Sequence, residues 1–416
     1  MRRLTIKNVG PIKSITIDLK RINVLIGLQS SGKSTINKIA CHCSWVEKEL
    51  YTNPMLNHVQ ISSYFIETLI EFHKLEGFFS KDSYIKFETD LIDFSFSYDK
   101  STFSFKWKTE DYWWSYKRNK TIYIPAERNI VAVIPNWFQI KLENTNLRNF
   151  LAHWQETRYS FSDKFQPILD LGVNYKYNKE KDTDELYLTS VNKTINIKNA
   201  SSGLQSIVPL YMLTEYINNE VYNQETKDSV EEVSVKRELK NSIYKSAEKD
   251  LSVIDKIKLE LKTTESSFQY VLQSVINNLE NIQQSNIFLE EPEVNLFPVT
   301  QRELVKHLVK STYHNAEGRE HSLFLTTHSP YILTTLNNLI YANDCAKAAS
   351  EEVKDIIGEE YWVDFNDVGV WFVRDGVVED ILDYEERQID ASKIDEVSQL
   401  LNNEFDNLLD TQYHEV

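Results

Sequence analysis

The stretch Gly27-Leu28-Gln29-Ser30-Ser31-Gly32-Lys33-Ser34-Thr35 follows an apolar run at residues 22–26 and opens a segment with helical periodicity. Two glycines at this spacing let the backbone wrap around a phosphate chain, so that successive N–H groups face the anion. Lys33 is then placed to reach the β and γ phosphates, and the Ser34 hydroxyl to reach Mg²⁺. Only ten glycines occur in 416 residues, which argues against a chance match. The stretch predicts a phosphate-binding P-loop.

Length and charge limit the classes of partner. A chain of 416 residues with 41% hydrophobic content is long enough for two or three globular domains. Its net charge of −16 repels nucleic-acid phosphate, so contact with nucleic acid would require a local basic patch. The negative net charge therefore favours a nucleotide or a protein as the partner.

The cysteines and the start of the chain indicate a cytoplasmic protein without a membrane partner. Three cysteines are too few for a disulfide scaffold. Cys41-His42-Cys43 has the makings of a metal clip, but no second ligand pair follows at zinc spacing, which favours an ordinary helix. The first residues lack the apolar stretch of a signal peptide, and no run approaches 18 apolar residues.

The N-terminal third is predicted to hold strands, one helix and a β-rich insert. Residues 1–26 alternate like strands with a turn at Gly10-Pro11, which predicts an antiparallel edge leading into the central strand of a mixed sheet. A helix is expected from Lys33 to about Leu50. Within the insert at 45–119, aromatic and polar residues largely alternate between 84 and 107, as in a β meander with one solvated face.

A mixed aromatic and basic segment at residues 112–118 leaves two interpretations open. Trp113, Trp114, Lys117 and Arg118 combine ring faces with positive charge, a mixture that binds single-stranded nucleic acid. The segment is equally placed to end the β meander by packing on the main domain, and this second interpretation is favoured.

A long helical arm is predicted at residues 219–285. No Gly or Pro occurs between Pro209 and Pro292. Apolar residues recur in steps of 4, 3, 4 and 3, the spacing of a coiled-coil seam, at Phe268, Leu272, Val275, Leu279 and Ile282. The arm is interpreted either as a solvated structural element or as one that grips a partner.

Two further apolar strands end in residues that suit phosphate chemistry. Residues 287–289 lead into Glu290 and Glu291, where the first carboxylate would hold Mg²⁺ and the second would polarise the attacking water. Residues 323–327 lead into His328, which is placed to contact the γ-phosphate. Alternatively, the two glutamates are only solvated charges at a strand end, and His328 has a structural role. The P-loop upstream favours the catalytic interpretation.

A second anion-binding surface is predicted at residues 199–206, where Ser202 and Gly203 precede a helical segment. An ordinary helix cap is the simpler explanation. Because one nucleotide does not need two cradles, however, the spare one implies binding to the nucleotide of another subunit.

The order of the P-loop, Ser-Ser-Gly-Leu-Gln-Ser, Leu-Glu-Glu-Pro-Glu and Thr-Thr-His resembles the ABC-type ATPase heads of the SMC and RecF group. Within it, the chain is most similar to the OLD-like ATP-binding proteins of bacterial antiphage systems, whose patterns match residues 125–128 (Pro-Ala-x-Arg), 201–206 and 290–298. The resemblance covers residues 1–44, 120–215 and 286–345. It implies a discontinuous head within 1–345, followed by a C-terminal hairpin and amphipathic helix at 346–416.

The resemblance also implies roles for residues at matching positions. The phosphate and magnesium binders would be Gly27, Ser30, Ser31, Gly32, Lys33, Ser34 and Thr35, with Mg²⁺ held by Ser34 and Glu290 and catalysis by Glu291 and His328. Ser202, Gly203 and Gln205 would meet ATP in the opposing subunit, and Asn295-Leu296 falls at the D-loop. Glu290 replaces the usual aspartate, and no Q-loop glutamine can be assigned.

OLD nucleases continue into a Toprim domain, and the segment after His328 is too short to hold one comfortably. The resemblance therefore implies an ATP-dependent homo-oligomer that acts as sensor and scaffold for a separate Toprim- or HNH-type nuclease or toxin. Systems of the PARIS type, then the Septu type, are the nearest analogues, with a phage protein as trigger. A RecF-like DNA-repair ATPase that clamps DNA is the alternative. A transporter subunit is disfavoured by the arm and by the glycine-poor signature.

Overall fold

The computed structural model describes residues 2–52, 58–108, 116–134, 143, 145–222, 277–278, 281–313, 319–390 and 396–413. At its centre is a six-stranded sheet in the order β15-β14-β3-β13-β12-β7. The strands are β3 (Ile22–Gly27), β7 (Asn119–Ile124), β12 (Gln284–Glu290), β13 (Ser322–Thr327), β14 (Val368–Arg374) and β15 (Val377–Asp380). All pairs are parallel except β14 with β15. The fold is therefore mixed α/β, as predicted.

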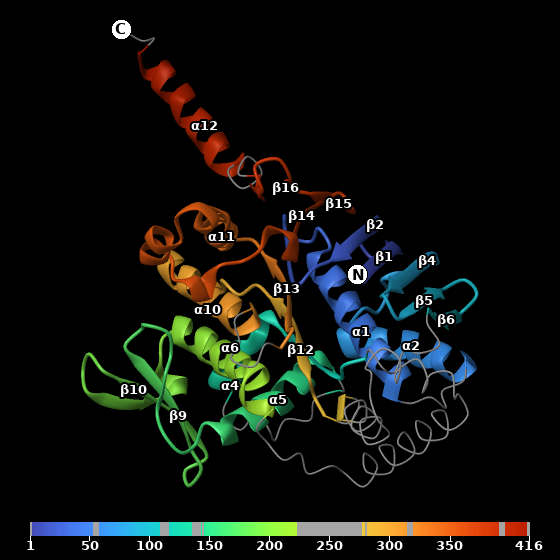
Figure 1. Ribbon diagram of the computed structural model, residues 1–416, viewed down its shortest axis with the longest axis horizontal. Helices are drawn as coiled ribbons and strands as arrows, with labels where there is room; N and C mark the ends of the chain where they lie inside the picture. Colours follow the sequence, from blue (N-terminus) through green and yellow to red (C-terminus); the bar gives the residue numbers. More distant parts are fainter. Residues whose placement is uncertain are drawn as a thin grey trace, which may run out of the picture.

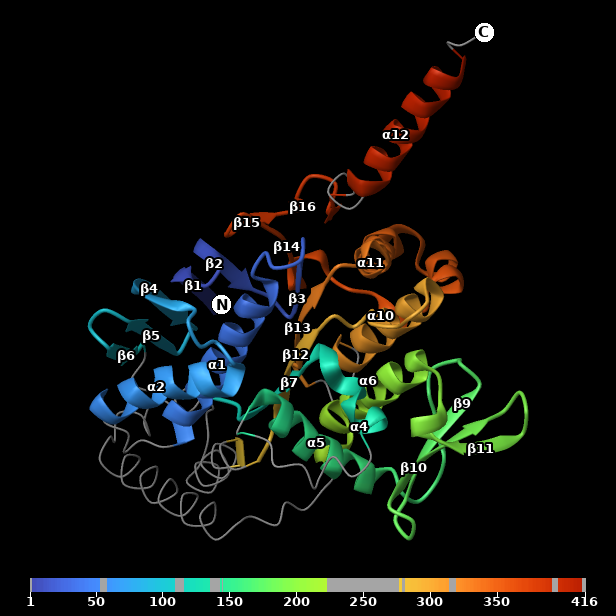
Figure 2. The same cartoon turned by 180° about the vertical axis from the view of Figure 1, so that it is seen from behind.

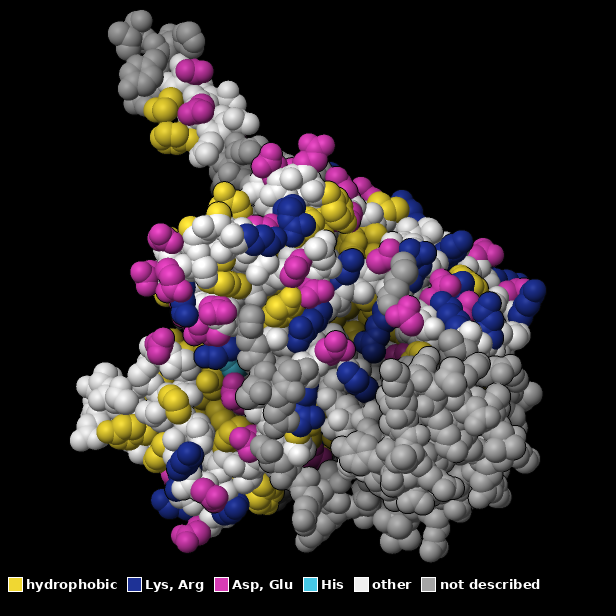
Figure 3. Space-filling model, in the orientation of Figure 1, with side chains coloured by type: hydrophobic (Ala, Val, Ile, Leu, Met, Phe, Trp, Pro, Cys, Tyr) yellow, Lys and Arg dark blue, Asp and Glu magenta, His cyan; other side chains and the backbone are white. Residues whose placement is uncertain are grey.

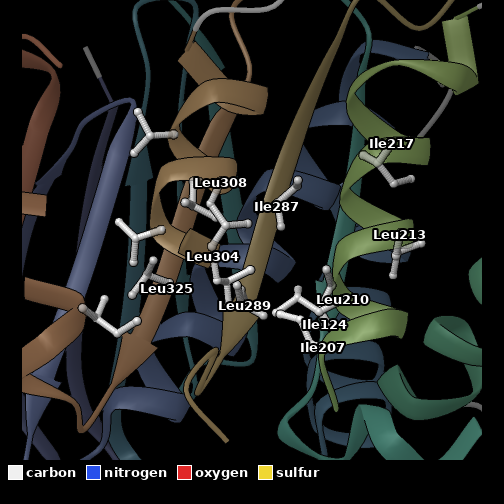
Figure 4. Close-up of a cluster of buried hydrophobic side chains, with 14 of the residues drawn as sticks. Ile124, Ile207, Leu210, Leu213, Ile217, Ile287, Leu289, Leu304, Leu308 and Leu325 are labelled. Carbon is white, nitrogen blue, oxygen red and sulfur yellow. The ribbon is translucent and has the colours of Figure 1, made fainter. Parts of the chain in front are cut away.

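Both faces of the central sheet are covered, which explains the continuous apolar runs of its strands. Ile287 and Leu289 of β12 point to one face, where they pack with α6 and α10 (Figure 4). Phe288 points to the other face and joins the core around α1. The helices are α1 (Lys33–Thr52) on one face and α5 (Asn146–Ser160), α6 (Ser202–Asn218), α10 (Pro298–Tyr313) and α11 (Pro330–Ile356) on the other (Figures 1 and 2).

A separate antiparallel sheet packs over α1 in the order β2-β1-β4-β5-β6. Its strands are β1 (Arg2–Val9), β2 (Ile12–Leu19), β4 (Phe79–Glu88), β5 (Ile92–Ser97) and β6 (Thr102–Trp107), and α2 (His58–His73) packs on it. The predicted antiparallel N-terminal edge of the central sheet is therefore wrong. Strand β1 pairs with β2 on one side and, on the other, with β4 of the region predicted as an insert. The antiparallel edge of the central sheet is β15.

A small four-stranded sheet lies beyond α5 and α6 (Figure 1). It consists of β8 (Gln166–Pro167), β9 (Val173–Asn178), β10 (Thr183–Leu188) and β11 (Lys193–Asn196). The buried Arg158 of α5 donates to Asp182 and Asp184 at distances of 2.9 and 3.1 Å. This ion-pair network attaches the small sheet to α5.

The C-terminal segment contributes to the centre of the molecule. The predicted hairpin is present as β14 and β15, but β14 pairs with β3 from Val368 to Val373, so it is part of the central sheet. After the short strands β16 (Leu382–Asp383) and β17 (Gln388–Ile389), helix α12 (Glu396–Tyr413) projects away from the body (Figure 1). A boundary at residue 345 therefore separates strands that belong together.

Several predictions fall on residues at the edge of the described ranges or outside them. Most of the arm at 219–285 lies outside them, and its last residues are already strand β12. Trp113 and Trp114 also lie outside. Tyr116 is buried and stacks on Tyr51 with ring centroids 3.7 Å apart, which agrees with the packing interpretation of that segment.

The metal-clip alternative for Cys41 and Cys43 has no support in the described ranges. Both cysteines are buried in α1, and the described residues contain no group of three His, Cys, Asp or Glu side chains placed to hold a metal ion. No helix in the described part is long and apolar enough to cross a membrane.

Candidate nucleotide-binding site

The carboxyl ends of three parallel strands meet at one edge of the central sheet. In the register of these strands, Glu290 of β12 pairs with Thr326 of β13, and Thr327 pairs with Ile26 of β3. The residues that follow each strand therefore lie at the same level. In this way the sheet brings the P-loop, the paired glutamates and His328 together from three distant parts of the sequence.

The P-loop conformation depends on its second glycine. Gly32 has a φ of +108°, and a Cβ at this position would lie 2.3 Å from the Ile12 side chain of the neighbouring antiparallel sheet. The Gly32 carbonyl accepts from Ile36 N at 3.0 Å, so the loop leads directly into the first turn of α1. Ser34 and Thr35 lie in that turn, as the motif predicted.

Lys33 is held against its own loop. Its Nζ donates to the carbonyls of Gly27 and Leu28 at 2.9 and 2.7 Å, and the residue is only 5% exposed. Burial lowers the pKa of Lys33 to about 8, while the carboxylates of Glu291 and Glu293 act in the opposite direction. The ammonium group is thus desolvated, which suits it to bind an incoming anion.

If this site binds ATP, Lys33 should make that binding pH-dependent. Near pH 8 about half of the unliganded sites should carry a neutral Lys33, and phosphate oxygens would restore the charge, because an opposite charge favours the ionised form. Affinity should therefore fall as pH rises through 8, and binding at pH 8 should take up about half a proton per site. Calorimetry in buffers of different ionisation enthalpy measures this uptake. It should vanish at pH 6.5, and its absence at pH 8 would contradict the assignment of Lys33.

The paired glutamates differ in environment. Glu290 is 8% exposed, and its Oε1 has no hydrogen-bond partner among the described residues. Glu291 is the first residue beyond the strand, and its side chain is 37% exposed. Its φ of +41° turns the chain sharply, and its N–H donates to the Thr326 carbonyl at 2.9 Å. One carboxylate is thus buried beside the sheet, and the other faces the open side.

A third carboxylate, Glu293, completes the cluster. Its Oε1 accepts from the His328 backbone N–H at 2.6 Å, and its Oε2 is buried without a hydrogen-bond partner in the part of the chain that the structure describes. The His328 ring lies beside Glu291, with 3.6 Å between Nε2 and Oε1. No role was predicted for Glu293, although its place in Glu-Glu-Pro-Glu was a signal. It joins the turn after β12 to the turn after β13.

The residues present fit a nucleotide phosphate with a hydrated divalent cation. Buried polar atoms are normally hydrogen-bonded. Buried atoms without a partner here include Ser31 Oγ, Glu290 Oε1, Glu293 Oε2 and Thr326 Oγ1. Phosphate oxygens would accept from the hydroxyl groups, and a cation with its water molecules would satisfy the carboxylates. Mg²⁺ is commonly bound by one or two carboxylates and substrate phosphates, so Ser34 and Glu290 are a sufficient protein contribution.

The predicted second cradle lies at the start of α6. Ser201 is the N-cap, and its hydroxyl accepts from Leu204 N at 3.4 Å, while Ser202 is exposed and free to meet a ligand. Gln205 differs from the others. Its side-chain amide donates to the carbonyls of Ile197 and Lys198 at 3.3 and 3.1 Å, so it supports the preceding loop and does not face outward.

Comparison with known proteins gives only distant similarity. No protein-family model matches the chain, and no curated protein matches it. Among solved structures, the recombination mediator protein RecF-ATPrS of the RecFOR pathway matches with 12% identity and a TM-score of 0.30, over 91% of this chain and 97% of that one. RecF-ATP matches with 10% identity and a TM-score of 0.29, over 91% and 98%. Similarity at this level carries no argument about activity, so the function depends on the geometry of the site itself.

Proposed function

We propose that this protein is an ABC-type ATPase that binds and hydrolyses ATP with Mg²⁺. One observation carries the proposal: a single edge of the central sheet gathers a desolvated lysine in a P-loop, two glutamates and a histidine. This set suits phosphoryl transfer to water, because catalysis of that reaction consists of positioning and charge stabilisation.

Each residue has a role that follows from its environment. Lys33 binds the terminal phosphates with the loop N–H groups, and Ser34 and Glu290 would hold Mg²⁺, which would supply charge neutralisation on the phosphates. Glu291 orients the attacking water and accepts its proton. His328 lies 3.6 Å from Glu291 Oε1, where it keeps the carboxylate directed at the water and contacts the γ-phosphate.

We further propose that two copies enclose the nucleotides. Large apolar side chains that follow three strands of the central sheet are exposed: Leu28 in the P-loop, Phe297 before α10, Val299 in its first turn and Tyr331 in the first turn of α11 are 60%, 73%, 61% and 52% exposed. Apolar side chains clustered around a charged site support contact with another protein surface. A second copy would cover them and bring its Ser202 and Gly203 to the phosphate bound at Lys33.

Complementation between two variants tests this arrangement. Lys33→Ala removes the phosphate contact of one chain, and Ser202→Arg blocks the cradle of the other. Neither variant alone should form ATP-dependent dimers. A mixture of the two should do so, because the heterodimer retains one intact site, and about half of random pairs are heterodimers. Mass measurement with and without ATP gives the result. Ser350→Arg, on the exposed end of α11, is the control. Dimers of Ser202→Arg alone would overturn the proposal.

The finer proposal is that this ATPase is the sensor and scaffold of an antiphage system and controls a separate nuclease or toxin. Helix α12 supports a separate partner, since it stands clear of the body with Phe405 and Leu408 60% and 68% exposed (Figure 3). The helix carries four acidic residues and no Lys or Arg. Its negative charge disfavours pairing with a second α12 and fits an apolar groove rimmed by basic residues.

Co-purification with the product of an adjacent nuclease gene tests the effector role. Phe405→Asp should abolish it. Asn403→Asp adds the same charge about 200° around the helix and should leave it intact. Retention of the partner by Phe405→Asp, or failure of the unmodified chain to retain any adjacent gene product, would contradict the role.

A further inference from the structure

Arg128 is a fully buried cation in the short helix η1 (Ala126–Asn129), directly after β7. Among the described residues, the hydrogen-bond acceptors of its guanidinium are all backbone carbonyls. The acceptors are Glu290 O at 3.0 Å, Glu291 O at 2.9 Å, Pro292 O at 3.1 Å, Ser206 O at 3.2 Å and Pro125 O at 3.5 Å. Three of these carbonyls belong to the consecutive residues 290–292, at the start of the turn 290–293 that carries the three glutamates and is called the carboxylate turn below.

Such an arrangement fixes the backbone orientation of the turn. Arginine presents its donors in a rigid planar fork, so bonds to Glu290, Glu291 and Pro292 define the directions of three successive peptide groups. Glu291 has a φ of +41°, a conformation that non-glycine residues rarely adopt and that its surroundings must therefore maintain. The carboxylate of Glu291 is consequently aimed by Arg128 through the backbone.

The Arg128 Nε donates to Ser206 in the first turns of α6, which begins at the second cradle. A second contact runs in parallel, since Asn295 Nδ2 donates to Ser206 Oγ at 3.0 Å. Gly203 also packs closely there, because a Cβ on it would lie 3.0 Å from the Asn295 carbonyl. The start of α6 and the carboxylate turn are therefore held as one unit.

We infer that Arg128 is a positioning residue that links the two nucleotide sites of the assembly. The inference rests on the proposed function, in which the start of α6 meets the nucleotide of the opposing subunit while Glu291 acts on the nucleotide of its own. Through Arg128, contact at Ser202 and Gly203 sets the orientation of Glu291 in the same chain. Hydrolysis at one site then requires an occupied partner site, and the ATP dependence of the rate is cooperative.

Arg128→Lys tests this role, because lysine keeps the charge and loses the fork. ATP affinity should stay within about twofold, kcat should fall by roughly 10- to 100-fold, and the Hill coefficient should drop to about 1. Arg158→Lys is the matched control, since Arg158 is equally buried and bonds outside the site. Rates are compared per folded molecule. Ser206→Ala removes only the Asn295 bond and should lower the Hill coefficient with little change in stability.

The outcomes separate the inference from the proposed function. The inference would be overturned if Arg128→Lys kept the kcat and the Hill coefficient of the unmodified protein. It would also be overturned if the Arg158→Lys control lost as much kcat and cooperativity as Arg128→Lys. If Arg128→Lys does not fold, Arg128→Gln, which keeps a side-chain N–H donor and also loses the fork, takes its place, and the kcat and Hill coefficient of the unmodified protein in Arg128→Gln overturn the inference. Absence of ATP hydrolysis or of ATP-dependent dimers in the unmodified protein would contradict the proposed function itself.

Discussion

Glu291→Gln is expected to bind ATP normally and to hydrolyse it about 10²- to 10⁴-fold more slowly, the range typical for loss of a general base. Glutamine has the same shape, so the turn with its φ of +41° and the bond from its N–H to Thr326 are retained. The amide cannot accept the proton of the attacking water. ATP should therefore remain bound, and the dimer should accumulate.

Single-turnover hydrolysis and mass measurement with ATP provide the two readouts. Glu320→Gln removes a carboxylate that is 71% exposed and lies 3.9 Å from Lys117, and it should change neither readout. A hydrolysis rate within twofold of the unmodified protein would assign the base to another residue. If Glu291→Gln released its bound ATP and formed no dimer, the nucleotide would not be enclosed between two subunits.

Gly27→Ala is expected to have the largest effect on stability. Gly27 has a φ of +154°, and a Cβ there would lie 2.2 Å from the Val373 carbonyl of the adjacent strand β14. Because the obstacle is backbone, either β14 or the P-loop must move. Overpacking and backbone strain each cost about 1–3 kcal/mol, so a loss of roughly 2–5 kcal/mol is expected. ATP binding should be lost as well, since the Gly27 carbonyl holds Lys33.

Chemical denaturation and ATP titration of the variant measure these losses. Gly77→Ala is a matched control: its φ is +76°, and a Cβ there would meet nothing within 4 Å. It should show the strain alone, about 1 kcal/mol, with full ATP binding. Equal destabilisation by the two substitutions would mean that the contact with Val373 is unimportant.

The parts of the site that were predictable from sequence are those made of contiguous residues. The P-loop is a short contiguous motif, since its glycines and Lys33 act within one turn. The strand before it and the helix after it could be predicted from their hydrophobic periodicity. The carboxyl ends of β12 and β13 could also be predicted from contiguous residues. An apolar run followed by charge marks the end of a buried strand whatever its neighbours are.

Partners of each strand were not predictable, because alternation fixes which face is buried and not which strand lies alongside. The N-terminal strands were expected to border the P-loop strand, yet β1 pairs with β4 and the P-loop strand pairs with β14. Arg128 was visible within Pro-Ala-x-Arg, but its acceptors are backbone carbonyls at positions 206 and 290–292. Carbonyls carry no sequence signal.

The position of β3 between β13 and β14 also bears on how the protein is made. Gly27 pairs with Val373, a residue 346 positions later in the chain. At translation rates of about 5–20 residues per second, roughly 15 to 70 s pass between synthesis of the P-loop and of the strand that flanks it. The nascent chain therefore contains the P-loop early, but at that stage it lacks strand β14, against which Gly27 packs. The proposed nucleotide binding therefore requires that β14 has been made, and a chain truncated before β14 should not bind ATP.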